Sequence, residues 1–164
     1  MLQLPIGALT HADSVFVSQN YGAGKTRRIA EGNRQAMGVI ALWSLAAFAV
    51  CWIGGRPLAL WLTAGADQWT VSRALLSMRL STACFFPLGA LFIFRYSMQS
   101  MGHKVIPVLS SAIELGAKIA SAAFIIPAWG YPGVAATEPV IWCVCAVFLG
   151  VFYFMRGRQR QKED

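Results

Sequence analysis

The chain has 164 residues, of which 57% are hydrophobic and only 13% are charged. Soluble domains carry roughly twice this share of charged residues, so the composition argues against an ordinary water-soluble enzyme. It also excludes a disordered chain, because this much apolar surface does not stay solvated. The net charge of +7 comes from basic clusters that flank long uncharged runs, which is typical of membrane helices. We therefore expect a lipid-embedded, all-α bundle that is not an enzyme, requires no cofactor and binds no nucleic acid.

The first 34 residues do not complete a membrane span. Residues 1–20 begin with an apolar stretch, but His11 and Asp13 interrupt it, so we interpret this segment as the end of a truncated transmembrane helix. Residues 21–34 contain four basic side chains and are predicted to form a basic cytoplasmic loop. Four full spans follow within residues 35–156, and residues 157–164 form a basic cytoplasmic tail.

One short motif in this loop resembles the end of a phosphate-binding loop. Gly24, Lys25 and Thr26 match its last three positions, but the pattern requires a glycine where this chain has Gln19. We therefore expect a tight turn between two helices here and no nucleotide site.

The four spans are predominantly apolar runs of about the length that a bilayer core requires. They are Gln35 to Gly55, Val71 to Ser100, Val105 to Ile126 and Val134 to Met155. Basic residues concentrate before the first span, between the second and third, and after the fourth. Because Lys and Arg mark the cytoplasmic side, both flanks are predicted to be cytoplasmic in a multi-pass membrane protein.

The second span contains a proline and two polar side chains near its end. Pro87 removes one backbone hydrogen bond and predicts a kinked helix. Arg95 and Gln99 share a face near the cytoplasmic end. The structural interpretation is that Arg95 extends toward the interface and that this face makes interhelical hydrogen bonds. The alternative is a role in transport.

The third span carries the most informative pair, Glu114 and Lys118. Glu114 lies near the predicted bilayer centre, where ionisable groups are costly and usually pair or face a cavity. The spacing places both residues on one face, which Ser110 and Ser121 extend as a polar stripe. The pair is either a structural ion pair or a carboxylate that responds to a proton or to substrate.

The fourth span begins near Glu138, which precedes Pro139. A carboxylate in the first turn of a helix interacts well with the helix dipole, so we favour a structural role for Glu138 over a transport role.

The four cysteines lie in apolar runs, where a thiol behaves as a small hydrophobic group. No metal site is expected.

Several segments in order resemble one transporter family. The matching segments are Phe16 to Lys25, Arg95 to His103 followed by Pro107, Ile113 to Lys118, and Gly133 to Trp142. Together they resemble the multidrug and toxic compound extrusion (MATE) family, in particular its bacterial sodium- or proton-driven efflux pumps. The resemblance implies a location in the bacterial plasma (inner) membrane. The resemblance implies a fold of twelve helices in two lobes, of which this chain matches only the carboxyl-terminal portion.

The resemblance also implies a function, a cation-coupled multidrug antiporter that works by alternating access. H⁺ or Na⁺ is then the coupling ion, cationic small molecules are the substrates, and the missing amino-terminal helices are partners. The carboxylates of that missing lobe have no counterpart here, and the second span holds no acidic residue, which leaves Glu114 as the central carboxylate. Two alternatives stay open: a lipid-linked sugar flippase of the same architecture, or a membrane fragment or subunit that does not transport.

Overall fold

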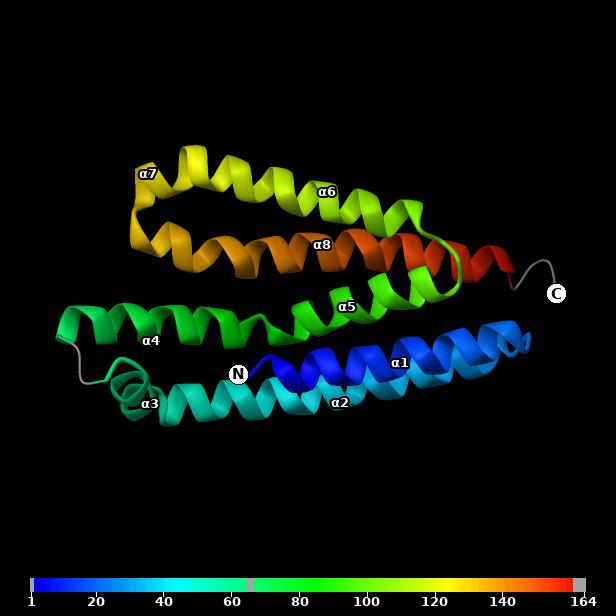
Figure 1. The fold of residues 1–164 in the computed structure, drawn as a ribbon, viewed down its shortest axis with the longest axis horizontal. Coiled ribbons are helices and arrows are strands. Elements are labelled where there is room, and N and C mark those ends of the chain that lie inside the picture. Colours follow the sequence, from blue (N-terminus) through cyan, green and yellow to red (C-terminus); the bar gives the residue numbers. More distant parts are fainter. Residues whose placement is uncertain (1, 65–66, 161–164) are drawn as a thin grey trace.

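The chain forms an elongated bundle of helices that run side by side (Figure 1). This computed structural model describes residues 2–64 and 67–160. Its elements are α1 (Leu4–Gly22), α2 (Thr26–Ile53), α3 (Gly55–Leu62), α4 (Gln68–Ala83), α5 (Phe85–Ser100), α6 (Val105–Ala120), the π-helical segment η1 (Ser121–Ile125), α7 (Ile126–Trp129) and α8 (Tyr131–Arg160). The described residues contain no strand, so the predicted all-α class is confirmed.

Four stretches of this bundle are long and apolar enough to cross a membrane. Three are helical throughout, Thr26–Ile53, Val105–Trp129 and Tyr131–Met155. The fourth is the bent pair α4 and α5. These four stretches coincide with the four predicted spans, because the apolar length that a bilayer requires is visible directly in the sequence.

The segment predicted as a basic loop is mostly helical. Helix α1 continues to Gly22 and α2 begins at Thr26, which leaves a turn of three residues around Gly24. Gly24 has a φ of +69°, a conformation that glycine adopts without steric cost. The arginines that follow lie on α2, where Arg27 pairs with Glu31 at 3.0 Å. The loop prediction was therefore too long, because basic side chains reach water from a helix as well as from a loop.

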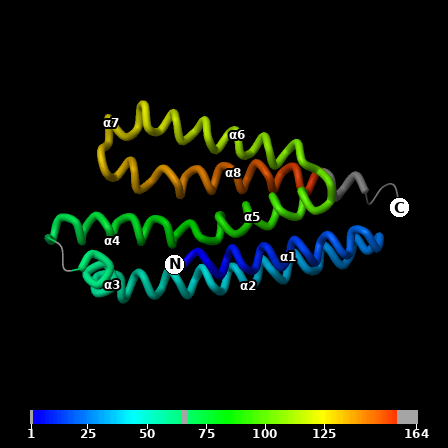
Figure 2. The backbone as a smooth tube through the Cα atoms, viewed as in Figure 1, coloured from blue at the N-terminus to red at the C-terminus, as the bar shows by residue number. Residues whose placement is uncertain are grey.

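The second span bends where the sequence predicted a kink. Helices α4 and α5 meet at Cys84 with an angle of 49° between them, and the break is visible in the backbone trace (Figure 2). Pro87 is the third residue of α5, so it offers no amide hydrogen to the carbonyl of Ala83 at the end of α4. The kink prediction is confirmed, and its position is explained by this missing hydrogen bond.

The turn between the third and fourth spans is shorter than predicted. Residues 127–133 were expected to form it, but α7 continues to Trp129 and α8 already begins at Tyr131. Only Gly130 separates them, with a φ of +60°. Two prolines in this segment misled the prediction, because proline is well tolerated in the first turn of a helix. At the other end, α8 extends to Arg160, and residues 161–164 of the predicted tail lie outside the described residues.

Helix α5 is the centre of the bundle and packs against α1, α2 and α8. Its buried side chains, such as Leu88, Leu91 and Ile93, belong to two hydrophobic clusters on either side of it. Helix α6 lies on the outside and packs mainly on α8 (Figure 1). The α1–α2 turn, the α5–α6 turn and the carboxyl-terminal end of α8 all lie at one end of the bundle (Figure 1).

Candidate functional site

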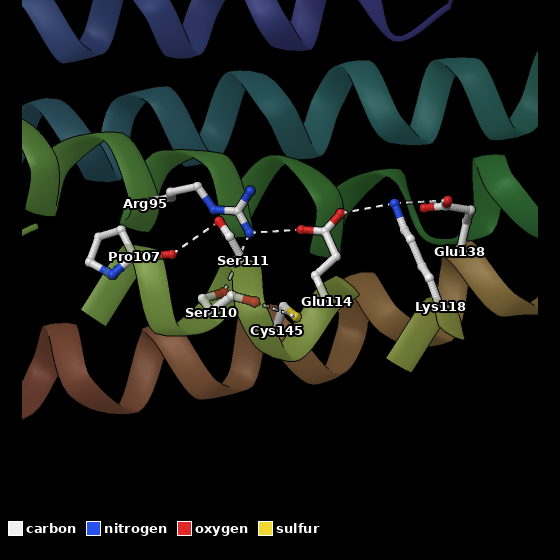
Figure 3. Close-up of polar contacts among 8 residues, drawn as sticks. All are labelled: Arg95, Pro107, Ser110, Ser111, Glu114, Lys118, Glu138 and Cys145. Atoms are coloured by element: carbon white, nitrogen blue, oxygen red, sulfur yellow. Dashed lines mark hydrogen bonds and ion pairs between the residues drawn. The ribbon is translucent and has the colours of Figure 1, made fainter. Parts of the chain in front are cut away.

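Four charged side chains from three helices form a continuous row along α6 (Figure 3). The Arg95 Nη2 lies 3.0 Å from Glu114 Oε2, and Lys118 Nζ lies 3.1 Å from Glu114 Oε1. The same Lys118 Nζ lies 3.1 Å from Glu138 Oε1. We call these four residues the charge chain. Because positive and negative groups alternate, each charge has an opposite neighbour and the row is neutral as a whole.

The predicted contact between Glu114 and Lys118 is present. Both residues lie on α6, and their spacing of four residues brings the ammonium to the carboxylate on one helix face. The interhelical hydrogen bonding predicted for Arg95 is present, but its side chain does not extend toward an interface as expected. Its side chain is only 14% exposed and turns from α5 toward Glu114, whose side chain is 22% exposed. A carboxylate at this depth attracts the nearest cation more strongly than the distant interface does.

Glu138 belongs to the charge chain for a reason that differs from the prediction. It is the eighth residue of α8, since the helix begins at Tyr131, so it lies beyond the first turn. The helix dipole acts within the first turn and does not reach this carboxylate. Its partner is Lys118 on α6. Gln99, by contrast, is exposed on α5 and lies outside the charge chain.

Two serines of the predicted polar stripe are buried beside the charge chain. The Ser110 hydroxyl accepts a hydrogen bond of 3.4 Å from Arg95 Nη2, and the Ser110 carbonyl faces the Cys145 thiol on α8. Ser121 is also buried, on the π-helical segment. These contacts fix the Arg95 end of the row, whereas Lys118 and Glu138 remain partly exposed at the other end. A charged solute therefore reaches the Lys118 end more easily than the Arg95 end.

An apolar groove of about 510 Å³ lies between α6–α7 and α8. Its walls include Ile113, Ala117, Thr137 and Ile141. Three of these residues adjoin Glu114, Lys118 and Glu138 in sequence, so the groove runs beside the charge chain. Apolar walls next to a few charged groups are typical of small-molecule sites.

Sequence reasoning missed a second buried polar cluster, at the interface of α1, α2, α5 and α8. The Asn33 Nδ2 donates to the Ser97 hydroxyl at 2.9 Å and to the Tyr153 hydroxyl at 2.8 Å. Asp13 on α1 is buried next to Ser97. In the sequence Asp13 was only an interruption of an apolar run. Four residues on four helices leave no local spacing pattern, so the signal available was the carboxylate itself.

A bundle of membrane-length apolar helices with charged side chains in its interior is typical of one class, the polytopic membrane proteins. The family model described as MatE matches residues 1–124 of this chain. The chain therefore belongs to the MatE family, whose members are membrane transporters. No match was found among the curated proteins or among the solved structures.

Proposed function

We propose that the chain is the carboxyl-terminal portion of a multidrug antiporter that exchanges a cationic small molecule for H⁺ or Na⁺ by alternating access. Family membership supports the transporter class, and the ordered motifs from Phe16 to Trp142 support the placement within the family. The bend at Cys84 supports a conformational cycle, because a broken span moves in two parts. The proposal includes the missing amino-terminal helices as the other wall of the pathway.

The observation that carries this proposal is the position of Lys118 between two carboxylates on two helices. Its ammonium lies 3.1 Å from both Glu114 and Glu138. A substrate cation that approaches from the exposed end competes with Lys118 for the same oxygens, because both offer one positive charge. The apolar groove beside these residues suits the hydrophobic body of such a cation. An amphipathic organic cation therefore suits this site, because its charge matches the two carboxylates and its hydrophobic body matches the apolar groove.

The flippase alternative predicts arginines gathered around one cavity. Among the described residues, the three arginines of α4 and α5 have separate partners instead. Arg73 lies over the Trp69 ring at 3.5 Å, Arg79 over the Trp52 ring at 4.8 Å, and Arg95 against Glu114. This arrangement gives no support to a site for an anionic lipid-linked sugar, so we retain the cation antiporter.

The decisive experiment replaces Glu114 in a transport-competent protein that contains this chain. Glu114→Gln keeps the shape of the side chain and removes its charge. We expect efflux of a fluorescent organic cation to fall by about tenfold or more at normal membrane abundance, the scale of one lost charged contact. Glu31→Gln is the matched control, because Glu31 pairs with Arg27 on the exposed start of α2, and efflux should stay unchanged.

A structural role for the charge chain gives a different result. In that case Glu114→Gln lowers membrane abundance, and a second change, Arg95→Met, restores it by removing the buried guanidinium that has lost its carboxylate. Efflux that returns together with abundance in this double variant contradicts a direct role for Glu114 in transport.

We also propose that the end of the bundle with the α1–α2 turn is cytoplasmic. Lys25 in that turn and Lys104 before α6 place basic residues at this end. In a background without native cysteines, a cysteine at Lys25 should react with an impermeant thiol reagent only from the cytoplasm. A cysteine at Gln68, at the other end, should react only from outside. The reverse labelling pattern contradicts the orientation.

A further inference from the structure

Asp13 is a buried carboxylate without a cation beside it. It lies on α1 and is only 7% exposed. Its Oδ2 accepts no hydrogen bond within the described part of the chain. The ion pairs found among these residues involve Arg27, Arg95 and Lys118, and none of them includes Asp13. The residue therefore differs from Glu114, which has two cations within 3.1 Å.

Asp13 has one hydrogen-bonding neighbour among the described residues, and its Oδ2 is left without a donor. Ser97 on α5 is the hydrogen-bonding neighbour of the carboxylate, and the Ser97 hydroxyl already accepts from Asn33 Nδ2 on α2. Asn33 is 5% exposed, and its Oδ1 also has no donor in the described residues. Tyr153 on α8 completes the cluster through its contact with Asn33. Asp13 and Asn33 thus contact the same serine, and each keeps one buried acceptor oxygen without a donor.

A bound proton resolves the deficiency at Asp13. An ionised carboxylate that is buried without a cation beside it carries a large desolvation cost. Protonation removes this charge and converts a carboxylate oxygen into a hydroxyl that can donate. The other titratable side chains nearby are placed differently, since the Tyr153 hydroxyl lies at the amide nitrogen of Asn33, and His11 is exposed and stacks on Tyr96.

We propose that Asp13 is a reversible proton-binding site, held between α1, α2, α5 and α8 and separate from the charge chain. The site lies about ten residues from the α1–α2 turn, roughly 15 Å along the helix, on the half of the bundle toward the proposed cytoplasmic end. Uptake or loss of this proton changes the charge at the contact of α1 with α5, two helices that pack closely along their length. A role for this proton in coupling rests on the proposed antiport; the binding of the proton does not.

The test is a pH titration of the purified chain in lipid, followed by infrared difference spectroscopy of the carboxyl carbonyl band. We expect one band from a buried protonated acid to grow as the pH falls, and Asp13→Asn to remove it. Glu114→Gln should leave that band in place, since Glu114 is held by two cations. Ser97→Ala should move the midpoint of the band, because it removes the hydroxyl next to the carboxylate.

Two outcomes overturn the proposal. If Asp13→Asn, folded as judged by circular dichroism, gives the same difference spectrum as the unmodified chain, Asp13 does not titrate. If the band disappears at constant pH when sodium replaces potassium, sodium occupies the site and the assignment to a proton is wrong. Because neither readout requires transport, a failure here is distinguishable from a failure of the antiport proposal, which efflux tests.

Discussion

The Arg95 guanidinium on α5 contacts the Glu114 carboxylate on α6, and this ion pair is a principal link between two helices that otherwise touch little. Helix α6 packs mainly on α8 at the outside of the bundle. The direct contact of α6 with the central helix α5 therefore relies on this ion pair and on the hydrogen bond from Arg95 to Ser110. This dependence leads to the first prediction.

Arg95→Met should destabilise the folded chain by roughly 1–3 kcal/mol, the range for hydrogen bonds to charged groups. Glu114 keeps Lys118 as a partner, which limits the loss. Arg27→Met is the matched control, because its pair with Glu31 is exposed and exposed pairs contribute little. The free energy of unfolding is measured in mixed micelles with increasing denaturing detergent. Equal losses for the two variants contradict a special role for the Arg95 contact.

Gly89 on α5 packs against Ile40 on α2, and a larger residue at this position is predicted to cause a steric conflict. A Cβ at this position collides with the Ile40 side chain, which is fully buried. Gly89→Ala should therefore cost about 1–3 kcal/mol. In an Ile40→Ala background the same change should cost nothing further, because the colliding methyl is gone. Gly116→Ala on α6 meets no atom within 4 Å and should be neutral or slightly stabilising.

Pro87→Ala should reduce the bend of 49° between α4 and α5. The new amide hydrogen can bond to the carbonyl of Ala83 and continue the helix through the break. Spin labels at Ser72 and Gln99, both exposed, measure the result as an increased distance between the two helix ends. Pro132→Ala is the control: Pro132 lies in the first turn of α8, where no helical hydrogen bond is missing. An unchanged distance in Pro87→Ala shows that packing holds the bend.

The start of α4 should lose stability in acid. The Thr70 hydroxyl donates a hydrogen bond of 2.7 Å to Asp67, and this bond holds the pKa of Asp67 below its ordinary value of 3.8. The contribution is present above that ordinary value and is lost as the pH falls through the lowered pKa. Thr70→Val should therefore lower the unfolding midpoint at neutral pH, and the difference from the unmodified chain should shrink below about pH 4.

Thr63→Val provides the control for this pH dependence. The Thr63 hydroxyl donates to the carbonyl of Ala59 at 2.8 Å, and a carbonyl does not titrate. The effect of this variant should be the same at every pH. A parallel decline for both variants contradicts the assignment to Asp67.

The sequence was sufficient for features that depend on neighbouring residues. Span length, the kink at Pro87 and the contact of Glu114 with Lys118 all follow from local composition or helical spacing. The contacts of Arg95 and Glu138 were not predictable in this way. They join different helices, so they depend on how far each helix is shifted along its neighbour, and a single sequence carries no direct signal for that shift.

Helix ends were the other source of error, and they had consequences for the site. The dipole interpretation of Glu138 failed because α8 begins at Tyr131, three residues before the predicted start at Val134. Asp13 was not predicted to be a functional residue, because residues 1–20 were interpreted as the end of a truncated helix. In the sequence, a carboxylate within an apolar run argues against a membrane span. In the folded bundle, the Asp13 carboxylate lies next to the buried Ser97.

The break in the second span places a thiol directly at the joint. Cys84 separates α4 from α5, and its sulfur lies 3.9 Å from that of Cys143 on the continuous helix α8. Two thiols this close need only a small adjustment to form a disulfide. A mild oxidant would then fasten the joint to α8, and a reductant would release it. A disulfide between Cys84 and Cys143 would thus tie the break in the second span to α8 without introducing a new residue.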